Sequence, residues 1–169
     1  MQSAHEKLLL FDLADPEKRT KDNILEALKI IHEYQKTFRV VLGLNAREAS
    51  HLCALLENTV SDMEDAAAFL REAIGVDTVV IHGTKRAAAA QATEVQSVDG
   101  PYCREPKLST GAGDHFNAGF MYSMIQQDAL KESLLNGVAN SGYYVRYGAS
   151  PTTEQLKDFR IAWQNGSFV

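Results

Sequence analysis

Residues 109–120 read STGAGDHFNAGF, in which Gly111, Ala112 and Gly113 precede an acidic residue, Asp114, and a segment of helical spacing. Glycine adopts backbone conformations that other residues avoid, and an acid in the first helical turn lies at the positive end of the helix dipole. The stretch therefore predicts a tight turn that opens a helix. Because the first N–H groups of a helix lack partners within it, the turn is also a candidate anion site.

Apolar residues at helical spacing follow this turn in two successive groups. The groups are Phe116, Phe120 and Met124, and then Leu130, Leu134, Val138, Gly142 and Val145. They predict two helices, the second of which ends at Gly148 because glycine favours the position after a helix. A last helix is expected from about Thr152 to Trp163.

Ahead of the turn, short apolar runs alternate with helical patterns. The runs at 7–13, 39–44 and 77–82 have the length of buried strands. Three helices are expected between these runs. The inner face of the first is Ile24, Leu28 and Ile31. The second follows an N-cap at Asn45 and has the inner face Ala49, Leu52, Cys53 and Leu56, and the third follows a Ser61–Glu64 capping box and has the inner face Met63, Ala66, Leu70 and Ala73. Residues 87–106 read as one or two antiparallel strands.

Buried apolar strands that alternate with helices indicate an α/β fold. We expect a doubly wound, mainly parallel sheet covered by helices on both faces, because a half-exposed strand would alternate polar and apolar residues. At 169 residues, without repeats or low-complexity tracts, the length favours one domain over residues 1–169.

Composition excludes several classes of protein. The net charge is −5 without a basic block, so we expect no nucleic-acid or membrane partner. Cys53 and Cys103 stand far apart without zinc-ligand spacing, which fits a reducing compartment. No apolar run has the length of a membrane span and no secretory signal is evident, so a cytoplasmic location is expected.

Four stretches carry a resemblance to a known family. STGAGDHFNAGF resembles the second signature of the ribokinase-like (PfkB) carbohydrate kinases, approximately D-T-x-G-A-G-D-x-F-x-x-G-F. The others are LGLNAREA at 42–49, similar to the N-x-x-E stretch; VVIHGTKRA at 79–87, similar to a strand ending in T-L-G-x-K-G; and ANSGYYVRYGASP at 139–151, similar to the adenine-end segment. They occur in family order and cover most of the chain.

The resemblance implies ATP as the phosphate donor, Mg²⁺ as the metal, and a role for each matching residue. Gly111, Ala112 and Gly113 would donate N–H groups to the transferred phosphoryl group, and Asp114 would take the proton of the substrate hydroxyl. Asn45 and Glu48 match the pair that orders magnesium and the phosphates, with Glu48 as the metal-site residue. The remaining matches, all on the nucleotide side, are Gly83, Lys85, Thr110 and Asn140.

Each of these residues also has a purely structural interpretation, which stays open at this point. Asp114 can serve as a helix-start charge, Asn45 as an N-cap alone, and Glu48 as a solvated helix residue. Lys85 can be an exposed loop lysine. His82, at the end of a strand, is expected to be a packed or surface histidine and not a catalyst.

The chain also departs from the family pattern. Leu108 replaces the acid that relatives associate with a monovalent-cation site, Ile81 replaces a threonine, and Arg86 replaces a glycine. The paired-glycine motif and β-sheet lid of the family's N-terminal half are not found. We therefore expect a C-terminal nucleotide-binding part of a ribokinase-like fold, which self-associates or pairs with a missing N-terminal segment.

The function expected is transfer of the ATP γ-phosphoryl group to a hydroxyl of a sugar or sugar-like alcohol, with this chain incomplete for catalysis. Two alternatives are a nucleoside kinase of the same fold and a non-catalytic nucleotide-binding module. A dinucleotide-binding domain is disfavoured, because no G-x-G-x-x-G follows the first strand.

Overall fold

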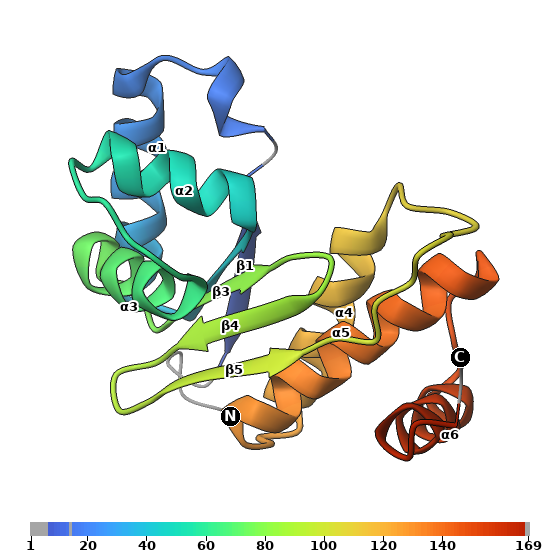
Figure 1. The fold of residues 1–169 in the computed structure, drawn as a ribbon. Helices are drawn as coiled ribbons and strands as arrows, with labels where there is room; N and C mark the ends of the chain where they lie inside the picture. Colours follow the sequence, from blue (N-terminus) through green and yellow to red (C-terminus); the bar gives the residue numbers. More distant parts are fainter. Residues whose placement is uncertain (1–6, 14, 168–169) are drawn as a thin grey trace. The chain divides into compact units, whose positions relative to one another are not determined.

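The computed structural model describes residues 7–13 and 15–167 (Figure 1). It divides into two compact units: the described residues up to 83 together with 88–96, and residues 84–87 together with those from 97 on. Strands β4 (Arg86–Ala90) and β5 (Val95–Asp99) each contribute residues to both units. Because units that share strands can form one domain or two, the expectation of a single domain stays a prediction.

The strands form one sheet in the order β1-β2-β3-β4-β5. The first three, β1 (Leu8–Asp12), β2 (Arg39–Asn45) and β3 (Thr78–His82), pair in parallel. Only a few residues connect β3 to β4 and β4 to β5, and such short connections join antiparallel strands. The sheet is therefore mixed, with parallel strands followed by two antiparallel strands, where the sequence predicts one or two.

Both faces of β2 and β3 are buried, whereas the residues of β1 are only partly buried or exposed. Val40, Leu42 and Leu44 on one face of β2 belong to the core shared with the first three helices. Val41 points to the opposite face, since side chains alternate along a strand, and it is also fully buried. This two-sided burial explains why residues 40–44 are continuously apolar, and it confirms the predicted fold class.

Three α-helices accompany these strands: α1 (Lys21–Tyr34), α2 (Ala46–Leu55) and α3 (Met63–Ile74), with a short 3₁₀ turn η2 (Pro16–Lys18) before α1. Their buried positions confirm most of the predicted inner faces, including Ile24, Leu28, Ile31, Ala49, Leu52, Cys53, Ala66 and Leu70. The apolar periodicity of each helix is thus explained by packing into one core.

The predicted start of α3 is wrong by one residue. Asp62, not Ser61, is the N-cap, and its carboxylate accepts the Asp65 N–H at 2.9 Å. The Ser61 hydroxyl instead donates to the Asp65 carboxylate at 3.4 Å. The predicted inner face also differs at the far end of α3, where Ile74 is buried and Ala73 is exposed.

The second unit contains α4 (Ala112–Ile125), α5 (Leu130–Tyr147) and α6 (Thr153–Gln164). Helices α4 and α5 pack closely through two glycines. A Cβ atom at Gly119 would lie 2.6 Å from the Asn136 carbonyl oxygen, and one at Gly137 would lie 2.8 Å from the Phe116 ring. Gly148 ends α5 at φ 70°, as predicted.

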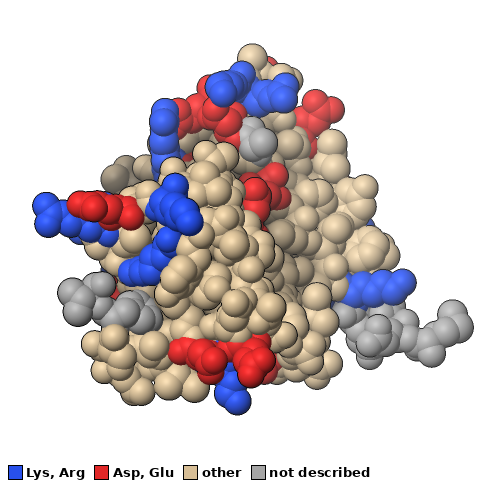
Figure 2. Space-filling model, turned by 90° about the vertical axis from the view of Figure 1, so that its right-hand side faces the viewer, with Lys and Arg blue, Asp and Glu red and all other residues tan. Residues whose placement is uncertain are grey.

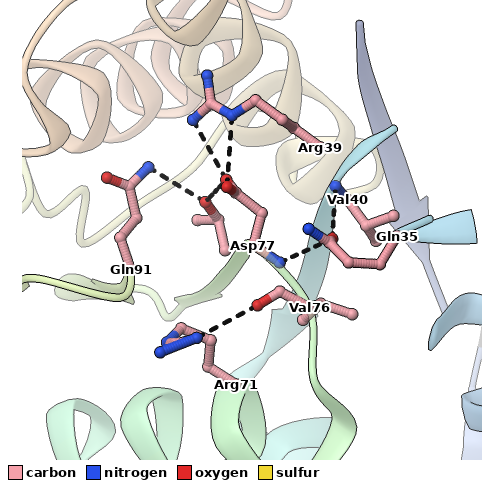
Figure 3. Close-up of polar contacts among 8 residues, drawn as sticks. Gln35, Arg39, Val40, Arg71, Val76, Asp77 and Gln91 are labelled. Atoms are coloured by element: carbon pink, nitrogen blue, oxygen red, sulfur yellow. Dashed lines mark hydrogen bonds and ion pairs between the residues drawn. The ribbon is translucent and has the colours of Figure 1, made fainter. Parts of the chain in front are cut away.

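A polar network ties the amino ends of β2 and β3 together (Figure 3). Arg39 donates from Nε and Nη2 to the two carboxylate oxygens of Asp77 at 3.3 and 3.2 Å. The Gln35 side-chain oxygen accepts the N–H groups of Val40 and Asp77 at 3.0 and 2.9 Å. The network lies at the opposite end of these strands from Asn45, and we assign it a structural role.

The face drawn in Figure 2 carries charged side chains of both signs. Figure 2 shows Lys and Arg next to Asp and Glu in small mixed groups on the face drawn. In the described part of the chain, no helix combines the length and apolar character needed to cross a bilayer. The mixed groups on this face agree with the absence of a basic block in the sequence.

Candidate functional site

The predicted anion site is a glycine turn, residues 109–113, at the start of α4. Gly111 is the N-cap with φ 87°, a left-handed conformation that glycine adopts without strain, and no side chain caps the helix. The Ala112 N–H donates to the Ser109 carbonyl at 3.1 Å. Among the described residues, no acceptor is found for the N–H groups of Gly111, Gly113 and Asp114. The donors left for an anion are therefore at 111, 113 and 114, whereas the N–H of Ala112 is already used within the turn.

Asp114 lies in the first turn of α4 and is exposed to solvent. Within the described chain its carboxylate has no hydrogen-bond or ion-pair partner, so it is not a helix cap. A carboxylate so placed can accept a proton from a hydroxyl held beside the turn. The position fits the predicted base, whose role stays a prediction.

Asn140 contacts the same part of α4 from within the protein. It is 8% exposed, and its side-chain N–H donates to the His115 carbonyl at 2.6 Å. Its amide therefore helps to hold α5 against the first turn of α4. Binding of nucleotide by Asn140 and by the exposed Thr110 stays a prediction.

In the first unit, Asn45 and Glu48 form a reciprocal capping box at the start of α2. Burial, together with the negative charges of Asp12 and Asp15, raises the pKa of the Glu48 carboxyl above its usual range. Since β2 and β3 are parallel with Asn45 opposite His82, Gly83 follows at the same carboxyl edge of the sheet. That edge is where open α/β sheets commonly bind ligands.

The nucleotide-side loop contains the two remaining candidates. Gly83 and Lys85 are both exposed. The Lys85 ammonium lies 5.1 Å from the centre of the Tyr102 ring, close enough for a cation–π interaction. Ile81, which departs from the family pattern, is fully buried in the core and is thus a packing residue. Arg86, another departure, donates to the Ser97 hydroxyl at 3.1 Å.

A family model described as prokaryotic ketohexokinase matches residues 3–162, nearly the whole chain. The chain belongs to the prokaryotic ketohexokinase family. A ketohexokinase of Haloferax volcanii is 32% identical over 153 residues, which make up 89% of this chain and 40% of that protein. The chain thus spans less than half the length of that relative.

Solved structures of ribokinase-like kinases share the fold. Ribokinase from Thermotoga maritima matches with a TM-score of 0.68 and 23% identity, over 90% of this chain and 48% of that chain. A nucleoside kinase from Methanocaldococcus jannaschii matches with a TM-score of 0.67 and 20% identity, over 91% and 48%. These matches confirm the ribokinase-like fold that the four sequence stretches predict.

Two side chains at the glycine turn were not singled out from the sequence. His115 Nδ1 bonds to the Gly111 carbonyl at 2.8 Å, and the Tyr144 hydroxyl donates to the Thr110 carbonyl at 2.9 Å. His115 occupies a position left unspecified in the family signature, directly after Asp114. That placement is the only signal in the sequence that could have drawn attention to it.

Proposed function

We propose that this chain is the nucleotide-binding part of an ATP-dependent sugar kinase, with the glycine turn as the site of the transferred phosphate. The observation that carries this proposal is a group of three N–H donors, at Gly111, Gly113 and Asp114, beside the exposed Asp114 carboxylate. The described residues offer no acceptor for any of the three. The family to which the chain belongs supports a sugar as the acceptor.

The proposed reaction needs a base and stabilisation of negative charge. The acceptor hydroxyl oxygen attacks the γ-phosphorus, the bond from that phosphorus to the β,γ-bridging oxygen breaks, and ADP leaves. The hydroxyl proton passes to Asp114. N–H groups at the start of α4 bind the phosphoryl oxygens as their charge develops, which is the main contribution a protein makes to this reaction.

The residues at the carboxyl edge of β2 fit a magnesium ion. The pKa of Glu48 is raised by burial and by the carboxylates of Asp12 and Asp15, so a cation there would meet several negative groups. Within the described residues no cluster of three or more ligating side chains stands ready for a metal. Magnesium bound to nucleotide commonly needs few protein ligands, and when bound it neutralises phosphate charge. We propose that Glu48 orders it, with Asn45 beside it.

The other nucleotide contacts are proposed on the strength of family position and exposure. Gly83 lets a nucleotide approach the backbone closely, because it has no side chain. Lys85 presents a positive charge to the phosphates, and Thr110 and Asn140 flank the start of α4. The name of the Haloferax volcanii relative supports a ketohexose, phosphorylated at a hydroxyl group, as the substrate.

We further propose that the free edge of β1 is a pairing surface. Strand β1 is the first in the sheet order, so among the described strands it pairs only with β2. Unpaired N–H and C=O groups at such an edge favour the addition of another strand. A second copy of the chain or a further segment of the same protein could supply that strand.

The function is tested by measuring ADP production with a coupled assay. The assay compares D-fructose, D-ribose, fructose 6-phosphate and adenosine, on this chain and on the longest product that its gene encodes. We expect sugar-dependent ADP production by a longer product, fructose being the best acceptor, and MgATP binding without sugar turnover by the chain alone. Adenosine as the best acceptor would favour a nucleoside kinase, and no binding of MgATP would overturn the proposal.

A further inference from the structure

Two neighbouring carbonyls of the glycine turn are held by aromatic side chains. Tyr144, from α5, donates its hydroxyl to the Thr110 carbonyl at 2.9 Å, and His115, from α4, bonds through Nδ1 to the Gly111 carbonyl at 2.8 Å. A carbonyl oxygen only accepts, so the proton lies on Nδ1 of the histidine. The turn is thus fixed from its carbonyl side.

The two aromatic rings also hold each other. Their centroids are 3.6 Å apart and their planes differ by 12°, so they are stacked. The second ring nitrogen of His115, Nε2, lies 2.8 Å from the Ser150 hydroxyl, just beyond the end of α5. The pair of rings is therefore anchored to three segments: the turn, the helix α5 and the loop that follows it.

Both nitrogens of His115 are engaged inside the protein, so the imidazole is not placed to act as a second base beside Asp114. Its contacts suit it instead to fixing the backbone of the glycine turn. In a trans peptide the C=O and the following N–H lie in one plane and point in opposite directions. Holding the carbonyls of Thr110 and Gly111 therefore fixes the directions of the next two N–H groups, at 111 and 112. The Gly111 N–H is one of the donors left for an anion, and the Ala112 N–H closes the turn on the Ser109 carbonyl.

The turn needs such support because glycine is conformationally free. Gly111 has φ 87°, and without a side chain it populates other backbone conformations as readily. No side chain caps the helix at this point. The Tyr144 hydroxyl would also lie 3.2 Å from a Cβ atom at Gly111, so the phenol occupies the space beside the glycine.

We propose that His115 and Tyr144 are positioning residues that hold the glycine turn in one conformation and thereby set its affinity for phosphate. The second part of this inference rests on the proposed function, because it takes the turn as the phosphate site. The first part, that the two rings order the turn, stands without it.

Three variants separate the contacts. Tyr144→Phe keeps the stacked ring and removes the bond to Thr110, and His115→Phe keeps a ring and removes the bond to Gly111. His115→Asn restores a donor near the position of Nδ1 but loses the stack. Tyr143→Phe is the matched control, since Tyr143 packs on Tyr147 and Phe159.

The first measurement is the backbone order of the turn by ¹⁵N NMR relaxation, without ligand. We expect lower order parameters at 111–113 in Tyr144→Phe and His115→Phe, partial recovery in His115→Asn, and none of these changes in Tyr143→Phe. Thermal unfolding confirms that each variant is folded. Unchanged backbone order parameters at 111–113 in both Tyr144→Phe and His115→Phe would overturn the proposal, whatever the chain binds.

The second measurement compares the affinity of the chain for MgATP and for adenosine by calorimetry. Each lost hydrogen bond should weaken MgATP binding about fivefold and affect adenosine binding less, because the proposed function places the phosphates at the turn. Wild-type affinity for MgATP in both ring variants would overturn the phosphate part of the inference. A wild-type chain that binds no MgATP would instead refute the proposed function, and the NMR result would still decide whether the rings order the turn.

Discussion

Asn45 and Glu48 hydrogen-bond to each other's backbone across the first turn of α2. The Asn45 side-chain oxygen accepts the Glu48 N–H, and Glu48 Oε2 accepts the Asn45 N–H, both at 2.9 Å. Capping alone would favour these residue types at this spacing. A ligand role for Glu48 therefore has to be separated from its structural role by experiment.

Glu48→Gln should make the folded protein more stable at neutral pH. Burial and the charges of Asp12 and Asp15 raise the pKa of Glu48, so the folded state binds this proton more tightly than the unfolded state. The ionised carboxylate thus lowers the free energy of unfolding as the pH rises above about 4.3, the ordinary pKa of glutamate. Well below that pH the carboxyl is protonated in both states and does not lower it. Glutamine keeps an acceptor for the Asn45 N–H without the charge.

Urea unfolding in metal-free buffer at pH 7.5 and near pH 4 measures this difference. The variant should gain stability at pH 7.5, and most of that gain should be lost near pH 4, where most of the glutamate carboxyl is protonated. Glu72→Gln, at an exposed position of α3, is the control. A stability difference that does not change with pH would show that the environment of the Glu48 carboxylate is not what distinguishes the two proteins.

Asp114→Asn should abolish most catalysis and spare nucleotide binding. In a product with measurable kinase activity, removal of a positioned base lowers turnover by roughly 10²–10⁴. ATP affinity should change only a few-fold, because the N–H groups of the turn remain. Steady-state kinetics with Asp128→Asn, an exposed acid beyond α4, as control test this; turnover close to wild type would remove Asp114 from the mechanism.

Potassium should not activate the enzyme specifically. Leu108 stands where the resemblance places an acid, and its side chain has no oxygen to coordinate a cation. The measurement is a titration of potassium chloride against sodium and choline chloride at constant ionic strength. A saturable rise in rate seen with potassium alone would mean that other oxygens build a cation site.

The isolated chain should self-associate through the edge of β1. Leu10→Lys places a charge on that edge and should increase the monomer fraction, since edge charges oppose strand addition. Ile30→Lys makes the same charge change at an exposed position of α1 and should leave the monomer fraction unchanged. Light scattering over a concentration series decides; a wild-type chain that is monomeric throughout would contradict the expectation.

Gly119→Ala should destabilise the protein even though alanine favours helices. The added Cβ would lie 2.6 Å from the Asn136 carbonyl and 2.8 Å from Asn140 Cβ. Backbone cannot retreat as a flexible side chain can, so we expect a loss of about 1–3 kcal/mol in the free energy of unfolding. Urea unfolding measures it, with Ala118→Ser, an exposed position on the same helix, as control. No loss would show that the two helices can separate freely.

The strands and helices could be predicted because their apolar residues recur with clear periods. Residues 40–44 are apolar throughout since both faces of β2 are buried. The start of α3 could not be fixed in the same way. Ser61 and Asp62 are both good N-caps, and the choice depends on how the chain enters the helix.

The site residues were predictable where they form a local motif and not where they meet by folding. The glycine turn and Asp114 are contiguous, so their pattern is visible in the sequence. The contact of His115 with Ser150 joins residues 35 positions apart, and no local pattern points to it. Tyr144 likewise reads as an ordinary helical residue until α5 is packed against the turn.

Asp114 and Gly119 belong to the same signature at 109–120, but they are required for different reasons. Gly119 is needed wherever α4 and α5 pack as closely as they do here, whether or not any reaction takes place. Asp114 is exposed and is required only by the chemistry proposed for it. A lineage that gave up phosphoryl transfer would therefore be free to replace the acid while keeping the glycine. Among distant descendants of this fold, the combination of residues at these two positions would separate pseudoenzymes from working kinases.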